Sequence, residues 1–369
     1  MLLLTPGPVQ TRPEVRAAMA VDIAPWDEDF RPEYAALRDR VTAIAGGIPG
    51  IHATLPLQGC GHFIMEAAIR SFMAPGAKIL VPMNGCYAER IAKLAEASGR
   101  VAVRMPLPDT RSVTRAEVQA ALEADPAITH VGVVQSETGS GIVNDVDAVG
   151  AAVRAAGRRM IVDAVSAFGA LPFRMADHPE CDALLFTSNK CLEGLPGLGF
   201  AVCELERALA AQGRAGSWSL DLGDVAAHAL KSGWGSFRFT PPAQVIRAFG
   251  VAMRLYEEEG GQPARLARYA ENARILHEGL TGLGLRPYLD AAHQGPIIVT
   301  VHQPAGFALQ PFVDALKRRG VLISNFFTTP TPTIRIGCIG QVSPSQTRWA
   351  VGQIGLALRE AGVRQLETA

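Results

Sequence analysis

The chain has 369 residues, of which 48% are hydrophobic and 19% charged, and its formal net charge is zero. A neutral chain without basic clusters lacks the charge pattern of proteins that bind nucleic acid or an anionic membrane surface. No apolar run approaches the roughly 18–20 residues that span a bilayer, and the first residues lack the basic segment of a signal peptide, so we expect no membrane partner.

The cysteines and histidines predict neither disulfides nor a metal site. The six cysteines show no Cys-x-x-Cys spacing, and several lie in apolar segments. Buried thiols of this kind are typical of a reducing compartment, which predicts a cytoplasmic protein. The eight histidines form no metal-ligand spacing such as His-Glu-x-x-His.

Between residues 50 and 204, short apolar segments alternate with segments of helical periodicity. Near-continuous apolar strands separated by helices indicate a mostly parallel sheet covered on both faces. The predicted strands are 78–84, 100–106, 129–136, 158–164, 182–188 and 198–204, and the predicted helices are 62–73, 87–98, 114–124 and 145–156.

The pattern changes towards the carboxyl end. Residues from about 242 to 282 predict two long helices. A strand in GPIIVTVHQ, a helix over 310–319, short strands in VLISN and TIRIG, and a last helix from about 344 follow. We therefore predict an N-terminal segment (1–15), a large domain (16–255) and a smaller C-terminal α+β domain (256–369).

Four segments place polar residues just after predicted strands, where open α/β sheets bind ligands. They are QGCGHFIMEAA (58–68), QSETGSGI (135–142), IVDAVSAFG (161–169) and FTSNK (186–190). The last segment ends at Lys190, one of only five lysines in a chain with 30 arginines. Unlike arginine, a buried lysine loses its proton readily and becomes a nucleophilic amine.

Taken singly, these signals are weak. A Gly-x-Gly turn before a helix, an aspartate at a strand end and a lone lysine most often have structural or surface roles. Together, however, glycines before a helix cradle a phosphate, Asp163 supplies a carboxylate, and Lys190 supplies an amine 27 residues later. A pyridoxal phosphate enzyme needs these three parts: the lysine for the Schiff base and the carboxylate for the pyridine nitrogen.

Motifs along nearly the whole chain carry a resemblance to a known family. The segments LLLTPGP, NGCYAER, SETGSGI, SNKCLEGLPGLGF, FRFTPPAQVIRAF and IRIGCIG resemble the class V aminotransferases among the fold-type I pyridoxal phosphate enzymes. Within that class they are most similar to the transaminases that move the amino group of 2-aminoethylphosphonate to pyruvate. The resemblance implies an α/β fold with a mostly parallel seven-stranded sheet, a smaller C-terminal domain, and a homodimer with shared active sites.

The resemblance also implies roles for individual residues. Lys190 matches the Schiff-base lysine, and Asp163 matches the carboxylate on the pyridine nitrogen. Arg335 matches the arginine that binds the anionic group of the substrate, a task suited to a planar guanidinium. Thr240 matches a residue that reaches the cofactor phosphate of the neighbouring subunit.

The remaining matched positions are further cofactor contacts. Tyr87 matches the aromatic side chain that stacks on the ring, and Thr138 lies at the position near the ring hydroxyl. The phosphate contacts implied by the resemblance are Cys60, Gly61, His62 and Asn189.

Two departures leave the amino donor open between two alternatives. The phosphate loop reads GCGH where phosphonate transaminases usually have Gly-Ser-Gly-Thr, which is closer to alanine–glyoxylate and serine–pyruvate aminotransferases. In addition, SNFF (324–327) replaces a lysine-bearing turn near the substrate arginine. We expect 2-aminoethylphosphonate as donor and pyruvate as acceptor, with a small amino acid as the alternative donor.

Two other functions fit the sequence less well. A cysteine desulfurase needs a nucleophilic cysteine on a mobile loop, but the segment NFFTTPTPT has none, and Cys338 lies in a strand-like run. A binding protein that had lost its chemistry would be favoured by the absence of Lys190 or Asp163, and both are present.

Overall fold

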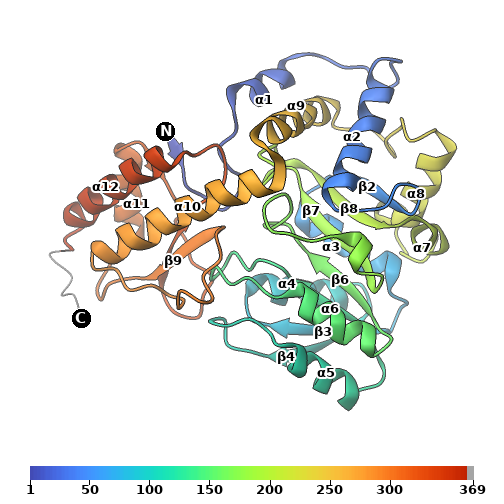
Figure 1. The fold of residues 1–369 in the computed structure, drawn as a ribbon, viewed down its shortest axis with the longest axis horizontal. Helices are drawn as coiled ribbons and strands as arrows, with labels where there is room; N and C mark the ends of the chain where they lie inside the picture. The colour runs from blue at the N-terminus through green and yellow to red at the C-terminus, as the bar shows by residue number, and fades with distance from the viewer. Residues whose placement is uncertain (364–369) are drawn as a thin grey trace.

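The computed structural model describes residues 1–363, and its largest feature is a seven-stranded sheet (Figure 1). The strand order is β2-β8-β7-β6-β5-β3-β4. The strands from β3 to β7 pair in parallel, whereas β8 is antiparallel to both of its neighbours. The bounds are β2 (His52–Gly59), β3 (Lys78–Met83), β4 (Val101–Pro106), β5 (Ile128–Val134), β6 (Arg159–Asp163), β7 (Cys181–Thr187) and β8 (Gly197–Glu204). The predicted mostly parallel sheet of seven strands is confirmed.

All six predicted strands are present, but the sequence analysis missed β2. This strand lies at one edge of the sheet and pairs only with β8. It contains Pro56, which lacks a backbone N–H and is tolerated mainly at sheet edges. A proline inside an apolar segment argues against a strand, and for this reason the sequence pattern did not predict β2.

Helices cover the sheet on both faces and bury its alternating side chains. Ile161 and Val162 are neighbours on β6, yet they belong to two separate hydrophobic clusters, one on each face. The helices of this part are α1 (Pro13–Ala17), α2 (Phe30–Ile44), α3 (Gly61–Phe72), α4 (Cys86–Ala97), α5 (Arg115–Ala124), α6 (Val146–Ala155), α7 (Leu205–Ala210) and α8 (Leu222–Lys231). Three short 3₁₀ helices are η1 (Ala18–Ala20), η2 (Met175–Asp177) and η3 (Trp218–Leu220).

Two long helices lead from the sheet to the C-terminal part of the chain (Figure 1). They are α9 (Ala243–Glu259) and α10 (Gly261–Gly282), and Gly260 separates them with a φ of +110°. Glycine adopts this left-handed conformation without the steric cost that a Cβ adds, so it commonly ends a helix. The elements that follow are β9 (Ile298–His302), α11 (Leu309–Arg318), β10 (Val321–Leu322), β11 (Thr333–Gly337) and α12 (Pro344–Glu360).

The N-terminal residues join this C-terminal part rather than the large sheet. The short strand β1 (Leu2–Leu3) pairs in parallel with β10, while β9 and β11 form an antiparallel pair. Leu2 and Leu4 belong to the hydrophobic cluster of the C-terminal elements. The division at residues 15 and 255 stays a prediction, and residues 364–369 of the predicted small domain lie outside the described residues.

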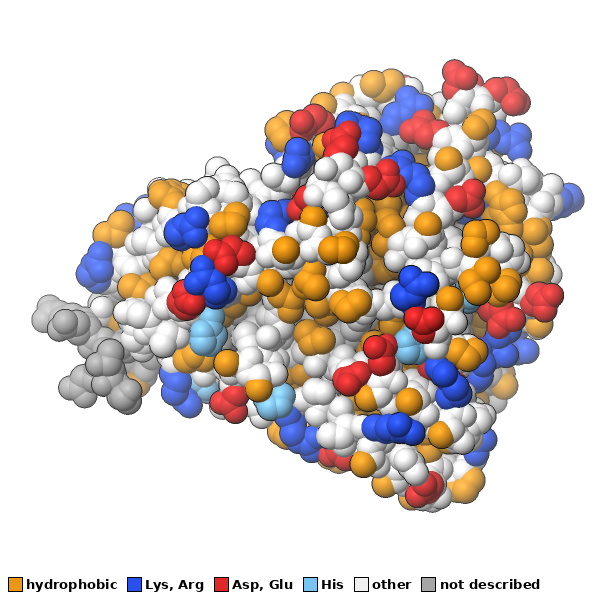
Figure 2. Space-filling model, in the orientation of Figure 1, with side chains coloured by type: hydrophobic (Ala, Val, Ile, Leu, Met, Phe, Trp, Pro, Cys, Tyr) orange, Lys and Arg blue, Asp and Glu red, His pale blue; other side chains and the backbone are white. Residues whose placement is uncertain are grey.

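Among residues 1–363, no helix is long and apolar enough to cross a membrane. On the face that Figure 2 shows, basic and acidic side chains are interspersed rather than gathered by sign. This distribution agrees with the zero formal net charge of the sequence.

Candidate active site

Lys190 lies in the turn that follows β7, at the carboxyl end of that strand. Its Nζ donates a hydrogen bond to the backbone oxygen of Pro6, at 2.8 Å. Gly7, with a φ of +134°, lies so close that an added Cβ would overlap the lysine side chain. Burial lowers the pKa of Lys190 to about 8, and the positive charge of Arg90 acts in the same direction. A larger fraction of this amine is therefore neutral near pH 7 to 8 than of a lysine with the ordinary pKa.

Asp163 ends β6, the strand next to β7, and is 2% exposed. One carboxylate oxygen accepts a hydrogen bond from the backbone N–H of Val165 at 3.0 Å. The other forms an ion pair with Arg90, a residue of α4. Because β6 and β7 are parallel neighbours, Asp163 and Lys190 lie together at the carboxyl ends of the strands, as the sequence predicted.

The segment from Cys60 to His62 forms the start of α3. Cys60 is the N-cap residue, and its side chain makes no capping hydrogen bond. Gly61 is buried, and a Cβ there would lie 2.9 Å from a methyl group of Val165, so glycine allows the helix start to approach the end of β6. The first turn of a helix presents N–H groups that bind anions such as phosphate. Cys60 and His62 are exposed beside it.

Arg335, on β11, is 2% exposed and reaches the loop after β5. Its Nη1 donates to the backbone oxygen of Thr138 at 2.9 Å and to Oγ1 of Thr328 at 3.3 Å. Its Nε is buried without a hydrogen-bond partner. Because a buried donor of a charged group is costly to leave unpaired, this atom points to an anionic ligand at Arg335.

The ring of Phe326 lies beside the same guanidinium. The Cζ of Arg335 is 4.7 Å from the centroid of this ring, a cation–π distance. Phe326 is also 57% exposed. The segment SNFF therefore places an aromatic side chain, and no further cation, against the predicted anion site.

Tyr87 lies in the first turn of α4, and its half-buried ring is close to Arg90. The Cζ of Arg90 is 4.7 Å from the centroid of the Tyr87 ring. Asn189 is half-buried and directly precedes Lys190. Thr240 is different: it is exposed between α8 and α9, and within residues 1–363 it makes no hydrogen bond or ion pair with the other predicted site residues.

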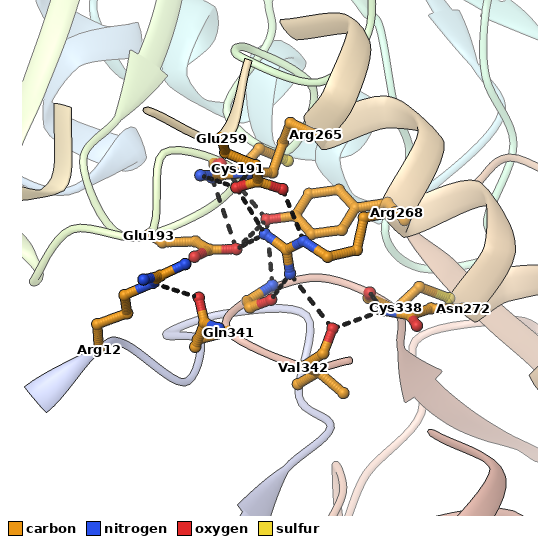
Figure 3. A network of polar contacts seen from close by, with 12 residues as sticks. Arg12, Cys191, Glu193, Glu259, Arg265, Arg268, Asn272, Cys338, Gln341 and Val342 are labelled. Carbon is orange, nitrogen blue, oxygen red and sulfur yellow. Dashed lines mark hydrogen bonds and ion pairs between the residues drawn. The ribbon is translucent and has the colours of Figure 1, made fainter. Parts of the chain in front are cut away.

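A buried polar network fixes the backbone just after Lys190 (Figure 3). Arg265 donates to the backbone oxygen of Cys191 and pairs with Glu259 at 2.8 Å. Arg268 pairs with Glu193 and with Glu259, each at 2.7 Å. The loop that carries Lys190 is thereby tied to both long helices.

Sequence reasoning placed Glu137 after its strand but missed three contacts at this site. Arg90 pairs with Asp163, the carboxylate of Glu137 contacts the start of α4, and the backbone of Pro6 contacts Lys190. Only Arg90 carried a usable signal, because its spacing of three residues from Tyr87 places both side chains on one face of a helix. All three contacts, however, join segments far apart in the chain.

Comparisons with known proteins agree with this geometry. The family model described as Aminotransferase class-V matches residues 28–325. The chain is 43% identical over 364 residues to a 2-aminoethylphosphonate–pyruvate transaminase of Burkholderia ambifaria, covering 98% of this chain and 96% of that protein. It is 41% identical over 367 residues to the protein of the same name from Pseudomonas aeruginosa, covering 99% and 98%.

Solved structures share the fold over the full chain. A pyridoxamine–pyruvate aminotransferase from Mesorhizobium loti matches with a TM-score of 0.88 and 29% identity, covering 100% of this chain and 94% of that one. An alanine–glyoxylate aminotransferase from Nostoc matches with a TM-score of 0.86 and 23% identity, covering 98% and 94%.

Proposed function

Because the chain belongs to the class V aminotransferases, we propose that it transfers the amino group of 2-aminoethylphosphonate to pyruvate, with pyridoxal 5′-phosphate as cofactor. The products are phosphonoacetaldehyde and alanine. The observation that carries the proposal is the placement of half-buried Lys190 and buried Asp163 at the carboxyl ends of neighbouring strands. The named relatives, at 43% and 41% identity over nearly the whole chain, support the choice of substrates.

The residues at the carboxyl ends of the strands fit this cofactor. Lys190 would link covalently to it, Asp163 would hold the ring nitrogen protonated, and Tyr87 would cover one face of the ring. The uncapped start of α3 suits the phosphate group. When bound, the cofactor supplies an electron-withdrawing ring that stabilises negative charge at the carbon next to the amine.

Lys190 is also the group that moves a proton. Its pKa of about 8 leaves a substantial neutral fraction near pH 7 to 8, so Nζ can accept a proton from the substrate carbon and return it. The ordinary pKa of lysine, near 10.4, would leave almost none. Burial of the side chain thus makes the amine a usable general base.

Arg335 orients the substrate through its anionic group. The guanidinium is held by Thr138 and Thr328 through Nη1, which leaves Nε for an external acceptor. A phosphonate and the carboxylate of pyruvate both fit this fork. The same arginine would therefore serve donor and acceptor in alternate half-reactions.

A small amino acid as donor is the second candidate. The observation that favours it is the ring of Phe326, which lies beside Arg335. The segment SNFF (324–327) that carries this ring contains no lysine or arginine to add a second positive charge. A singly charged carboxylate needs less positive charge than a phosphonate. The desulfurase alternative has less support, because Cys338 is 1% exposed and burial raises its pKa, which disfavours the reactive thiolate.

We also propose a homodimer in the cytoplasm. Thr240 is exposed and directly follows Phe239, whose ring stacks edge to face on Trp218; the two aromatic residues are 44% and 68% exposed. Large exposed aromatic side chains are typical of protein interfaces. A reducing cytoplasm suits the free thiols of the six cysteines.

The deciding experiment is a set of half-reactions without pyruvate. The cofactor-loaded enzyme is mixed with 2-aminoethylphosphonate, alanine, serine or glycine at equal concentration, and the yellow absorbance of the bound cofactor is followed. We expect 2-aminoethylphosphonate to bleach it fastest. If alanine or serine bleaches it readily and 2-aminoethylphosphonate does not, the small-amino-acid aminotransferase is the correct function.

A further inference from the structure

Glu137 is a buried carboxylate that the proposed chemistry does not use. It follows β5 and is 0% exposed. One carboxylate oxygen accepts hydrogen bonds from the backbone N–H groups of Tyr87 at 3.0 Å and Ala88 at 3.4 Å. The other accepts from the backbone N–H of Gly139 at 3.1 Å. Glu137 therefore caps helix α4 from a different segment of the chain.

The start of α4 is shaped to receive this carboxylate. Its own N-cap residue, Gly85, supplies no side-chain cap. A Cβ at Gly85 would overlap the side chain of Glu137, so only glycine permits the close approach. The N-terminus of a helix stabilises a negative charge through its free N–H groups and the helix dipole. The helix start thus helps to compensate the buried charge.

The contacts of Glu137 connect three parts of the candidate site. Tyr87 is the ring expected to cover the cofactor, and it sits in the first turn of α4. Thr138 directly follows Glu137, and its backbone oxygen accepts the hydrogen bond from Arg335. Glu137 therefore links the start of α4, which carries Tyr87, to the loop that carries Thr138.

We propose that Glu137 is a positioning residue that sets the width of the slot between Tyr87, which would cover one face of the cofactor ring, and the loop of Thr138, which would lie near the ring hydroxyl. The inference rests on the proposed function, because the slot acts on catalysis only if that ring binds there. Glu137 would act through the backbone of Tyr87, Ala88 and Gly139.

The ionisation of Glu137 supports this role. Burial raises its pKa to about 7, against the three backbone hydrogen bonds. Several charged or titratable groups interact electrostatically with Glu137. They are Cys86, Tyr87 and Arg90 of α4, Asp163 of β6 and Arg335 of β11. Below neutral pH the protonated carboxyl would place a donor against N–H donors, which loosens the slot.

The test compares Glu137→Gln with Glu180→Gln, a matched control. Glu180 is also buried, at 3% exposed, but it pairs with His178 and Arg154 at the opposite end of the sheet. The amide keeps the size of the side chain while turning an acceptor into a donor. Both variants should unfold at lower urea concentration than the wild type.

Only Glu137→Gln should change the bound cofactor. We expect an altered induced circular dichroism of pyridoxal phosphate, weaker cofactor binding, and a kcat lower by about tenfold to a hundredfold, since small misplacements of reacting groups have effects of this size. Gly85→Ala disturbs the same contact from the helix side, and it should give the same spectral change if Glu137→Gln is not recovered folded.

The outcomes separate this inference from the proposed function. If the wild type binds pyridoxal phosphate and transaminates, but neither Glu137→Gln nor Gly85→Ala alters the induced circular dichroism, Glu137 is only a structural group. If the wild type takes up no pyridoxal phosphate, the function and the inference fall together. A change confined to the Glu137 and Gly85 variants, absent in Glu180→Gln, establishes the positioning role.

Discussion

At the scale of single residues, burial gives Lys190 properties that the exposed lysines of the chain do not share. Its pKa is lowered to about 8, whereas Lys93 is a solvated side chain, 71% exposed, on α4. A lowered pKa means that more amine is neutral at a given pH. The covalent uptake of pyridoxal phosphate by the apoprotein should therefore rise with pH and reach half of its maximal rate near pH 8 rather than above pH 10.

Substitution of the two lysines tests this assignment. Lys190→Ala should abolish the borohydride-reducible link and lower transamination by at least about a hundredfold, the scale of lost acid–base catalysis. Lys93→Ala should leave both unchanged. Peptide mapping after reduction identifies the labelled residue, and a pyridoxyl group on any lysine other than Lys190 contradicts the assignment.

Asp163 combines two charge interactions at one carboxylate. In the structure it pairs with Arg90, and in the proposed holoenzyme it holds the ring nitrogen protonated. Asp163→Asn removes both, so we expect a kcat lower by about a hundredfold and a free energy of unfolding lower by about 3–5 kcal/mol, because the Arg90 charge is left buried.

A matched control separates these two effects. Asp182 is 0% exposed and pairs with Arg159 and Arg207 at the start of β7, away from Lys190. Asp182→Asn should lower stability similarly while the absorbance of the bound cofactor stays as in the wild type. Near-normal turnover of Asp163→Asn would leave this aspartate a purely structural role.

At the scale of elements, the sequence predicted what local pattern determines. The strands from β3 to β8 are short apolar runs, and each was found within two residues of its expected bounds. The helices α3 to α6 follow from the 3.6-residue period in the same way. Asp163 ends one of these strands and Lys190 follows another. For this reason the sequence alone predicts both residues at the carboxyl ends of the strands.

What escaped prediction depends on contacts between distant segments. Arg90 and Asp163 are 73 residues apart in sequence, and Glu137 and Tyr87 are 50 apart. No local period encodes such pairs, because they arise only after the strands have been ordered in the sheet. The strand β2 was missed for a related reason, since its edge position alone makes Pro56 acceptable.

Helix α10 offers a comparison of a buried and an exposed arginine. Arg268 pairs with Glu193 and Glu259 and donates to the backbone oxygen of Gly340 at 2.6 Å. On the same helix, Arg274 is 52% exposed and pairs with two glutamates of α10 itself. The contacts of Arg268 tie the loop that follows Lys190 to the C-terminal part of the chain. The contacts of Arg274 lie within α10 itself.

The two arginines should therefore differ in their contribution to stability. Arg268→Ala should lower the free energy of unfolding by about 3–5 kcal/mol, because Glu193 and Glu259 each lose one cationic partner in a largely buried network. Arg274→Ala should lower it by less than about 1 kcal/mol, as for exposed ion pairs. Urea unfolding of the two variants measures both values, and equal losses would show that the network does not hold the loop.

At the scale of the whole molecule, the N-terminal residues complete two distant regions. Leu2 and Leu4 pack into the C-terminal cluster, and Pro6 and Gly7 reach Lys190 a few residues later. Arg335, which we propose binds the anionic group of the substrate, comes from that C-terminal part as well. The site is thus assembled from the large sheet, the C-terminal elements and the first residues of the chain.

The last prediction concerns Thr240, which lies exposed and apart from the cluster that its own chain forms. If the active sites are shared in a homodimer, Lys190 of one subunit works with Thr240 of the other. Lys190→Ala and Thr240→Glu, whose charge would repel the phosphate, should each be inactive alone. After unfolding and refolding together, half of the dimers are mixed, and each mixed dimer has one intact site, so about a quarter of wild-type activity should return. Sedimentation of the wild type as an active monomer, or no recovery in the mixture, would place each active site within a single chain.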